Sequence, residues 1–414
     1  MHAQMSETAL PESPYAWMRL AASLALMTVG GVAMYGVVVV LPALQVEFGV
    51  ARADASLPYT LTMIGFGAGG ILMGVLVDRY GVAVPAVIGS VCLSAGLILS
   101  GLSGSVFQFA IVHGVLAGML GCSATFAPLV ADISLWFNRR RGIAVAIVIS
   151  GNYVAGTVWP PILQYFIEHS GWRATYIGAG IFSLVVMLPL TLVLRTPPPS
   201  LAASATSTGK THLERPLGLS PTALMVLLCI AGVACCVAMS MPQVHIVAYC
   251  GDLGYGAQRG AEMVSVMMGF GIVSRLVSGW ICDRIGGLRT LLLGSVLQGI
   301  ALALFLPFDG LVSRYVVSAL FGLFQGGLVP AYPMIVREFF SPREAGTRVS
   351  IVLMATLFGM AFGGWISGAI FDYTGSYRAA FINGIGWNLL NLSIAAWLLR
   401  ASSRAPTAAP AFRG

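Results

Sequence analysis

The chain has 414 residues, of which 57% are apolar and only 9% are charged, and its mean hydropathy is +0.88. An average soluble domain carries about 25% charged residues, so this composition excludes a soluble globular protein and indicates a polytopic membrane protein. The net charge of +7 is explained by arginines at the ends of apolar segments and does not call for a nucleic-acid partner. The seven cysteines lie mostly inside apolar segments and predict neither a disulfide framework nor a metal site.

Apolar segments long enough to cross a bilayer as helices follow one another along the chain. Residues 1–16 are polar and lack a basic cluster, so the first apolar segment is expected to be a spanning helix rather than a secretory signal. The sequence predicts an all-α membrane protein with twelve transmembrane helices, near residues 20–42, 55–77, 83–102, 107–133, 142–165, 173–195, 221–247, 260–281, 287–306, 312–337, 347–371 and 377–400.

Basic residues gather at alternate ends of these segments. The loops richest in Lys and Arg face the cytoplasm under the positive-inside rule. Both tails and every second loop are the basic ones, through residues such as Arg79, Arg140, Lys210, Arg284 and Arg343. The sequence therefore predicts a multi-pass protein with both termini in the cytoplasm.

The two halves of the chain repeat each other. GVLVDRYG at 74–81 matches GWICDRIG at 279–286, and HSGWRATY at 169–176 matches TGSYRAAF at 374–381, both 205 positions later. A constant offset at separate places indicates two parallel six-helix pseudo-repeats.

The stretch at 196–219 separates the repeats. It holds three consecutive prolines, a run rich in Ser, Ala and Thr, and the only lysine, which is typical of a flexible polar linker. We therefore expect an N-terminal six-helix bundle in residues 1–195, a cytoplasmic linker in 196–219 and a C-terminal six-helix bundle in 220–414.

Three stretches carry a family resemblance: WFNRRRGIAVAIVISGNYVAG at 136–156, HIVAYCGDLG at 245–254 and SRLVSGWICDRIG at 274–286. With the repeated G-x-x-x-D-R-x-G motif, the chain resembles a major facilitator superfamily transporter over nearly its whole length. Within that superfamily it is similar to the monocarboxylate transporter family and its bacterial relatives. The resemblance implies the major facilitator fold, alternating access, and function as a monomer in a bacterial inner membrane.

Arg275 lies inside an apolar run, eight residues from Asp283 and so about 12 Å from the nearer helix end. A charge at that depth needs a partner or a water-filled cavity. Its repeat-mate is Gly70, so the shared scaffold does not require it. A guanidinium matches a carboxylate bidentately, which predicts that Arg275 binds an anionic substrate, although a purely structural arginine is the alternative. Where the animal relatives have an aspartate, four residues earlier, this chain has Gly271.

Other polar residues lie at depths that suit a central cavity. These residues are Tyr35, Asn152, Tyr153, Gln325 and Tyr332. Tyr35, Asn152, Gln325 and Tyr332 are predicted to line the substrate path, with interhelical hydrogen bonds as the alternative. His245 is predicted to contact substrate and to carry a proton, because histidine titrates near neutral pH. An interfacial histidine without such a role is the alternative.

The two copies of the repeated motif lie at cytoplasmic helix ends, where a carboxylate can meet a helix N-terminus and an arginine can tie two ends together. A cytoplasmic gate is the role that the resemblance implies. The predicted gating residues are Asp78, Arg79, Gly81, Asp283, Arg284 and Arg141. Plain topology and helix capping are the alternative.

The sequence has no phosphate-cradling loop of P-loop form and no zinc-spaced His/Cys group, so we expect neither an enzyme nor an ATP-driven pump, and no cofactor or metal. The predicted function is transport of small organic anions, monocarboxylates such as lactate or pyruvate, by proton-coupled symport. The expected partners are the carboxylate, protons and membrane lipids. An anion exchanger, an efflux carrier for apolar or amphipathic compounds and a non-transporting nutrient sensor remain open.

Overall fold

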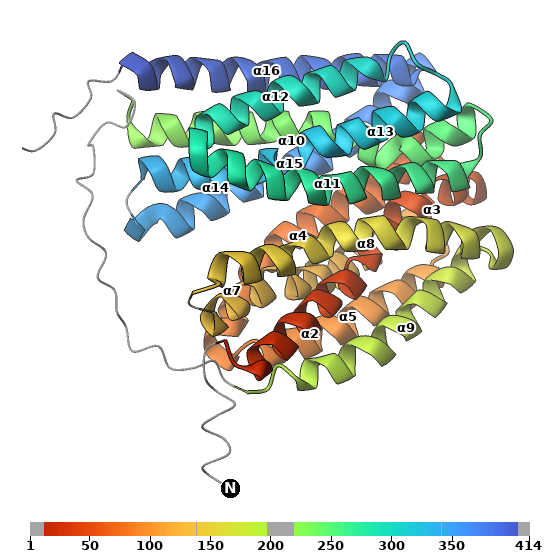
Figure 1. The fold of residues 1–414 in the computed structure, drawn as a ribbon. Coiled ribbons are helices and arrows are strands. Elements are labelled where there is room, and N and C mark those ends of the chain that lie inside the picture. The colour runs from red at the N-terminus through yellow and green to blue at the C-terminus, as the bar shows by residue number, and fades with distance from the viewer. Residues whose placement is uncertain (1–11, 138, 197–218, 341, 405–414) are drawn as a thin grey trace, which may run out of the picture.

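The computed structural model describes residues 12–137, 139–196, 219–340 and 342–404, and every regular element within them is helical (Figure 1). Twelve spans are long and apolar enough to cross a bilayer, which confirms the predicted fold class. Most spans are single helices: α4 (Arg52–Tyr80), α5 (Ala83–Gly101), α8 (Arg141–Ser170), α9 (Trp172–Leu192), α10 (Pro221–Asp252), α11 (Ala257–Ile285), α12 (Gly287–Leu304), α15 (Pro342–Thr374) and α16 (Tyr377–Arg404).

The first, fourth and tenth spans are divided. The first consists of α2 (Pro14–Gly30) and α3 (Val32–Phe48). The fourth contains α6 (Val106–Val112), the π-helix η1 (His113–Gly121), the 3₁₀ turn η2 (Cys122–Thr125) and α7 (Ala127–Trp136). The tenth contains α13 (Leu311–Gln325) and α14 (Leu328–Phe339), separated by two glycines. These interruptions were not expected from the apolar runs, which continue through all three.

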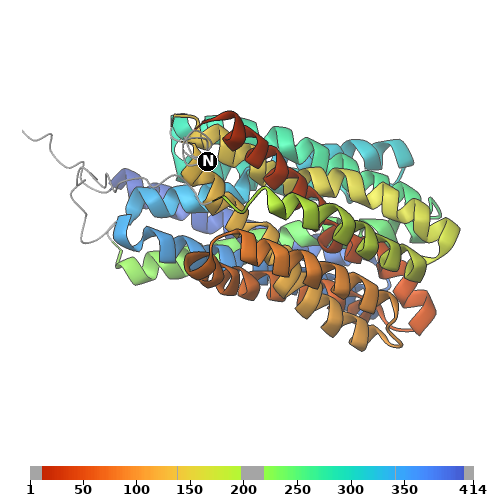
Figure 2. The same cartoon turned by 90° about the horizontal axis from the view of Figure 1, so that it is seen from below.

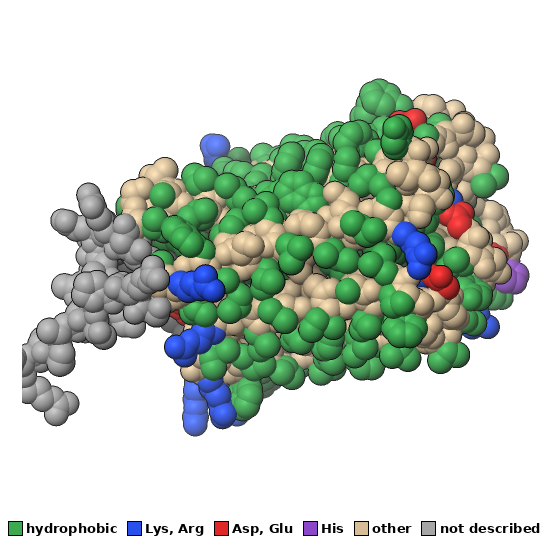
Figure 3. Space-filling model, turned by 90° about the horizontal axis from the view of Figure 1, so that it is seen from above, with side chains coloured by type: hydrophobic (Ala, Val, Ile, Leu, Met, Phe, Trp, Pro, Cys, Tyr) green, Lys and Arg blue, Asp and Glu red, His purple; other side chains and the backbone are tan. Residues whose placement is uncertain are grey.

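The helices run along one common direction (Figures 1 and 2). We call the end at which α2 and α10 begin the linker end and the other the distal end. We call α2–α9 the first half and α10–α16 the second half. On the face shown in Figure 3, hydrophobic side chains cover the middle and charged side chains lie toward the two ends. Large apolar residues such as Ile71, Val185 and Phe358 are exposed, and such a surface is stable in lipid rather than in water.

Glycine ends the two helices that carry the repeated motif. Gly81 follows α4 with φ 75°, and Gly286 follows α11 with φ 86°. Both angles lie in the left-handed region that side chains other than glycine rarely adopt. Each glycine N–H donates to a carbonyl four residues earlier, Val77 and Cys282 respectively. The last residue of the motif therefore closes a helix in the same way in both copies.

The two halves contact each other mainly toward the distal end. Helix α4 packs along α15, α8 packs along α11, and α3 contacts α10 and α11. Along α4, Gly67 lies against Met354 of α15, whereas Gly70 and Gly74, nearer the linker end, have nothing within 4 Å of a built Cβ. The structure thus has the halves joined at the distal end and separated along α4 at the linker end.

A buried ion pair holds the linker end of the first half together. Arg19 of α2 and Asp132 of α7 are joined by two hydrogen bonds of 2.7 and 2.8 Å, and both side chains are almost completely buried. The remaining guanidinium hydrogens go to the carbonyls of Val193, Leu194 and Thr196 after α9. One arginine therefore fixes the ends of three spans.

Replacing Arg19 with alanine is expected to destabilise the protein strongly. The change leaves Asp132 buried without its counter-ion, which costs about 3–5 kcal/mol for a buried pair. Thermal unfolding in detergent measures the effect. Arg195→Ala removes an exposed arginine at the same end and is the matched control, so equal melting temperatures for the two variants would contradict a structural role for the pair.

Candidate functional site

Arg275 lies in the middle part of α11 and is half-buried at the boundary between the halves. Its guanidinium carbon lies 4.4 Å from the centre of the Tyr153 ring of α8, and one Nη lies 3.4 Å from the Tyr153 hydroxyl. Its Nε is buried and has no hydrogen-bond partner. The face of the guanidinium is therefore held by a cation–π contact, while donors on its edge stay uncommitted.

Glycines on both helices create room for the rings of this site. A Cβ at Gly271, one turn before Arg275, would lie 2.4 Å from Cε1 of Tyr153. A Cβ at Gly156 would lie 2.5 Å from Cζ of Tyr35 and 2.6 Å from Cγ of Met268. Neither position can take a larger residue without displacing its neighbour. Gly271 thus has a local reason to be glycine: the ring of Tyr153 occupies the space beside it.

Tyr35 of α3 completes the cluster. Its hydroxyl lies 3.6 Å from the sulfur of Met268, and its ring lies beside Gly156, three residues after Tyr153 in α8. We call Tyr35, Tyr153, Met268, Gly271 and Arg275 the arginine site. It combines one cation with an aromatic and thioether wall, and it is built from α3 and α8 of the first half and α11 of the second.

Arg275 lacks the carboxylate partner that the fully or almost fully buried arginines of the spans have. Within the described residues, Arg19, Arg52 and Arg314 each pair with a carboxylate, of Asp132, Asp252 and Asp309 respectively. Arg275 takes part in no ion pair among those residues. Arg275 is half-buried within the span, and a charge at that depth without a counter-ion requires water or another polar partner.

Two more of the predicted residues lie near this site. Asn152 is half-buried in α8, next to Tyr153. Gln325 ends α13 and is buried, and both its amide oxygen and its amide nitrogen lack a partner. The following residue, Gly326, packs against the carbonyl of Gly271, which places the chain at Gln325 at the level of the arginine site.

Tyr332 lies elsewhere, inside the second half. It is fully buried in α14, and its hydroxyl donates to Oδ1 of Asn391 in α16 at 3.0 Å. Nδ2 of Asn391 in turn donates to Ser295 in α12 at 2.7 Å. Tyr332 therefore belongs to a polar network that joins three spans of one half and is not in contact with Arg275.

His245 also lies away from Arg275. It is buried near the distal end of α10, its Nε2 lies 2.8 Å from the carbonyl of Gly364 in α15, and its ring lies 5.8 Å from that of Tyr377. The structure thus places the residue predicted to carry protons among the distal contacts between α10, α15 and α16.

The structure reveals a charged cluster that was not predicted from the sequence. Arg52, the first residue of α4, donates to Asp252 of α10 at 2.7 Å and to the hydroxyl of Tyr377. The backbone N–H groups of Arg52 and Ala53 each donate to Asp372 of α15 at 2.8 Å, so a carboxylate of the second half caps a helix of the first. We call Arg52, Asp252, Asp372 and Tyr377 the distal latch.

The predicted gating residues lie at the linker end, where the halves are apart. Arg79 stacks on Tyr80 and Arg284 stacks on Trp280, and neither they nor the exposed Asp283 forms an ion pair in the part of the chain described. The side chains of Asp78 and Arg141 lie outside the described residues. In this conformation the described motif side chains therefore do not join the halves.

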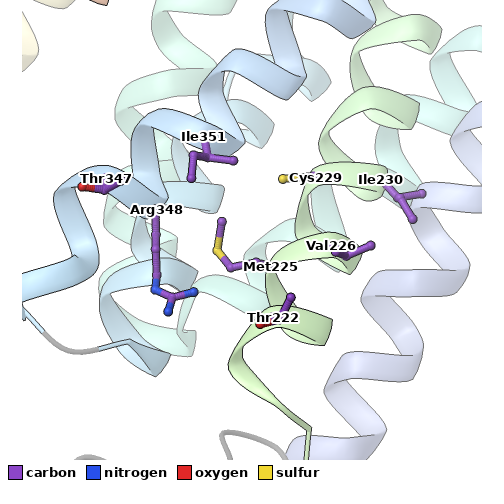
Figure 4. A pocket seen from close by; sticks show the side chains of 8 residues that line it. All are labelled: Thr222, Met225, Val226, Cys229, Ile230, Thr347, Arg348 and Ile351. Carbon is purple, nitrogen blue, oxygen red and sulfur yellow. The ribbon is translucent and has the colours of Figure 1, made fainter.

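A groove between α10 and α15 is separate from the arginine site. Figure 4 shows its lining near the linker end, and its volume is about 580 Å³. It contains none of the residues predicted to bind substrate, and its lining residues are Thr222, Met225, Val226, Cys229, Ile230, Thr347, Arg348 and Ile351. Because Val226, Ile230 and Ile351 are exposed apolar residues, the groove belongs to the apolar surface of the bundle.

Twelve membrane spans in two halves, counted over the described residues, are the architecture of a membrane carrier. The chain belongs to the Major Facilitator Superfamily, whose family model matches residues 21–317 and 263–414. This is a family of secondary transporters and not of enzymes.

Several named transporters are similar in sequence. The MFS-type transporter opdF of Penicillium oxalicum is 27% identical over 80% of this chain and 77% of its own length. Monocarboxylate transporter 13 of Bos taurus is 28% identical over 72% of this chain and 69% of its own length. The uncharacterised MFS-type transporter YcxA of Bacillus subtilis is 26% identical over 80% of this chain and 82% of its own length.

Solved structures confirm the fold. A bacterial homologue of the human lysosomal transporter Spinster has a TM-score of 0.71 at 16% identity and covers 95% of this chain and 98% of its own. The peptide transporter POT has a TM-score of 0.73 at 15% identity and covers 93% of this chain and 95% of its own.

Proposed function

We propose that this protein is a secondary transporter of small monocarboxylates, such as lactate or pyruvate, that works by alternating access. The single observation that supports the anionic substrate is Arg275, an intramembrane guanidinium with no carboxylate partner among the described residues and with its Nε unpaired. The similarity to monocarboxylate transporter 13 supports the same class of cargo.

In this proposal the carboxylate accepts hydrogen bonds from the free edge of Arg275 while Tyr153 keeps its place on the guanidinium face. Tyr35 and Met268 form the apolar wall for the substrate carbon atoms. Asn152 and Gln325 supply further polar contacts. Tyr332 and His245 are hydrogen-bonded to Asn391 and to the carbonyl of Gly364 respectively, and this proposal gives them no contact with the substrate.

The proposal also names the two bundles that move and the side of the membrane that each end of the protein faces. Residues 1–195 and 220–414 are the two bundles that rock about the arginine site, and 196–219 joins them; residues 197–218 lie outside those described. We place the linker end in the cytoplasm of a bacterium and the protein in its inner membrane as a monomer, on the basis of the basic residues at that end. The conformation described is then open toward the cytoplasm.

Efflux of apolar or amphipathic compounds is the second candidate. The observation that favours it is the wall of Tyr35, Tyr153 and Met268, which offers an aromatic and thioether surface. In that case Arg275 would serve only to hold Tyr153. The two candidates differ in whether a negative charge on the cargo is required.

The test is uptake of labelled lactate and pyruvate into proteoliposomes, first with the same unlabelled acid inside and then without it. Protein-free liposomes and competition by the neutral amide of each acid are the controls. We expect saturable uptake that other monocarboxylates inhibit and that the neutral amides do not. Transport of an amphipathic cation, with no uptake of any carboxylate under either loading, would favour the second candidate.

A further inference from the structure

The mode of coupling follows from what surrounds Arg275, provided that the proposed carboxylate function holds. On its own helix, the nearest acidic side chains are Asp283 and Glu262, eight and thirteen residues away, or about 12 and 20 Å along the axis. Asp283 is exposed, and Glu262 is bonded to Arg259 and Tyr315. Neither can neutralise the guanidinium.

Among the described residues, the other helices packed on α11 provide no acid that pairs with Arg275. Asp252 of α10 binds Arg52, Glu338 of α14 accepts from the backbone N–H of Gly287, and α12 has no Asp or Glu. In α3 the acidic residue is Glu47, which pairs with Arg173 at the distal end. In α8 it is Glu168, which binds Gln164 in the last turns, while His169 lies beside it and bonds to Tyr165. Helix α13 has no Asp or Glu, and its Arg314 binds Asp309.

The histidines of the spans are also committed to other contacts. His245 lies in the distal contacts described above. His113 is buried inside the first half, with Nδ1 2.9 Å from the Thr62 hydroxyl and its ring stacked on Phe109. Among the described residues, the aromatic ring and hydroxyl of Tyr153 are thus what Arg275 meets, and they supply neither a carboxylate nor an imidazole.

Because Arg275 lacks a counter-ion in the protein, the loaded and the empty carrier should differ in how easily they change conformation. While the halves rock, the site passes through a state closed at both ends, in which water is reduced and an unpaired guanidinium is strongly disfavoured. A bound monoanion supplies the missing charge and the bidentate acceptor. The loaded carrier therefore crosses this state more easily than the empty carrier, and return of the site requires another anion.

We propose that the protein is an obligatory exchanger of monocarboxylates, in which the cargo itself is the counter-ion of Arg275. One anion moves inward for each anion that moves outward, and no proton takes part. Tyr153 is the residue that sets this mode, because its ring covers the face of the guanidinium and fills the space beside Gly271, where it excludes a carboxylate from the protein.

The deciding experiment compares proteoliposomes loaded with unlabelled lactate with proteoliposomes loaded with potassium chloride, with the membrane potential clamped by valinomycin and equal potassium. We expect internal lactate to raise the initial rate of labelled lactate uptake about tenfold or more, which corresponds to a barrier lower by about 1.4 kcal/mol. An inward proton gradient should not replace it. Rapid uptake into the chloride vesicles that is driven by the proton gradient and carries protons inward would overturn the exchange mechanism.

A matched pair of variants tests the role of Tyr153. Tyr153→Glu places a titratable carboxylate beside Arg275, and Tyr153→Gln places a neutral side chain of the same size there. We expect the Glu variant to gain net, pH-dependent uptake into chloride vesicles relative to the Gln variant, which should depend on internal lactate. Equal dependence in the two variants would contradict the assignment to Tyr153. Failure of the wild type to move any carboxylate under all loadings would instead reject the proposed function.

Discussion

Replacement of Arg275 with alanine is expected to weaken monocarboxylate binding by about 30-fold or more. Removing one partner of a buried charge pair costs about 2–5 kcal/mol, and each 1.4 kcal/mol corresponds to a factor of ten. The loss should be visible both as a lower uptake rate at fixed substrate and as a loss of the ligand-induced rise in melting temperature. The protein should still fold, since Arg275 makes no ion pair among the described residues.

Arg275→Lys should fall between wild type and alanine. Lysine keeps the charge but cannot present two parallel donors or stack a planar group on Tyr153. Arg259→Ala is the matched control, because Arg259 is an exposed arginine on the same helix, paired locally with Glu262. Uptake that remains complete in Arg275→Ala, or that falls equally in Arg259→Ala, would rule out the arginine site as the anion site.

Hydropathy determined the depth of each polar residue but not the side of the helix on which it lies. Arg275 and Tyr332 both sit in mid-span, yet Arg275 meets Tyr153 of the other half while Tyr332 points into its own half and bonds to Asn391. His245 was judged by its depth and titration range in the same way, and it lies against Gly364. The partner of Arg275, Tyr153, comes from the other half, and no local pattern encodes such a contact.

The residues of the distal latch could have been found by comparing the two repeats for charges that only one of them has. Gly70 in the first repeat marked Arg275 as an unrepeated charge. The same comparison marks Arg52, whose mate is Ala257, and Asp372, whose mate is Ile167. Charges that one repeat has and the other lacks are free of the shared scaffold, so they are candidates for contacts between the halves.

An ion pair within the first half has no counterpart within the second half, because the equivalent acidic residue belongs to the distal latch. In the first half, Arg173 binds Glu47 at 2.7 Å and the carbonyl of Gly101 at 3.0 Å. The equivalent residue of the second half, Arg378, binds the carbonyl of Leu306 at 2.9 Å, which corresponds to Gly101 in the repeat.

Asp252 corresponds to Glu47, yet it binds Arg52 from the opposite half in place of Arg378. When the distal end opens, Arg52 withdraws with α4. We therefore expect Asp252 to exchange partners and to bind Arg378, as Glu47 binds Arg173.

This exchange predicts opposite effects for two arginine substitutions. Arg52→Ala removes the partner of the closed distal end, and Arg378→Ala removes the partner of the open one. We expect the ratio of distal-open to distal-closed molecules to rise about fivefold in Arg52→Ala, or about 1 kcal/mol, because Asp252 is partly exposed to solvent. In Arg378→Ala the ratio should fall. Uptake should decrease in both, because alternating access needs both states.

Distances between spin labels at Val46 and Val312 measure the ratio directly, in a cysteine-free background. Both side chains are highly exposed at the distal end, one on each half, so the labels disturb little. Arg173→Ala is the matched control, since it breaks the equivalent pair within one half and leaves the latch intact. If Arg52→Ala and Arg378→Ala move the distance distribution in the same direction, Asp252 does not exchange partners, and the latch only adds to the stability of one state.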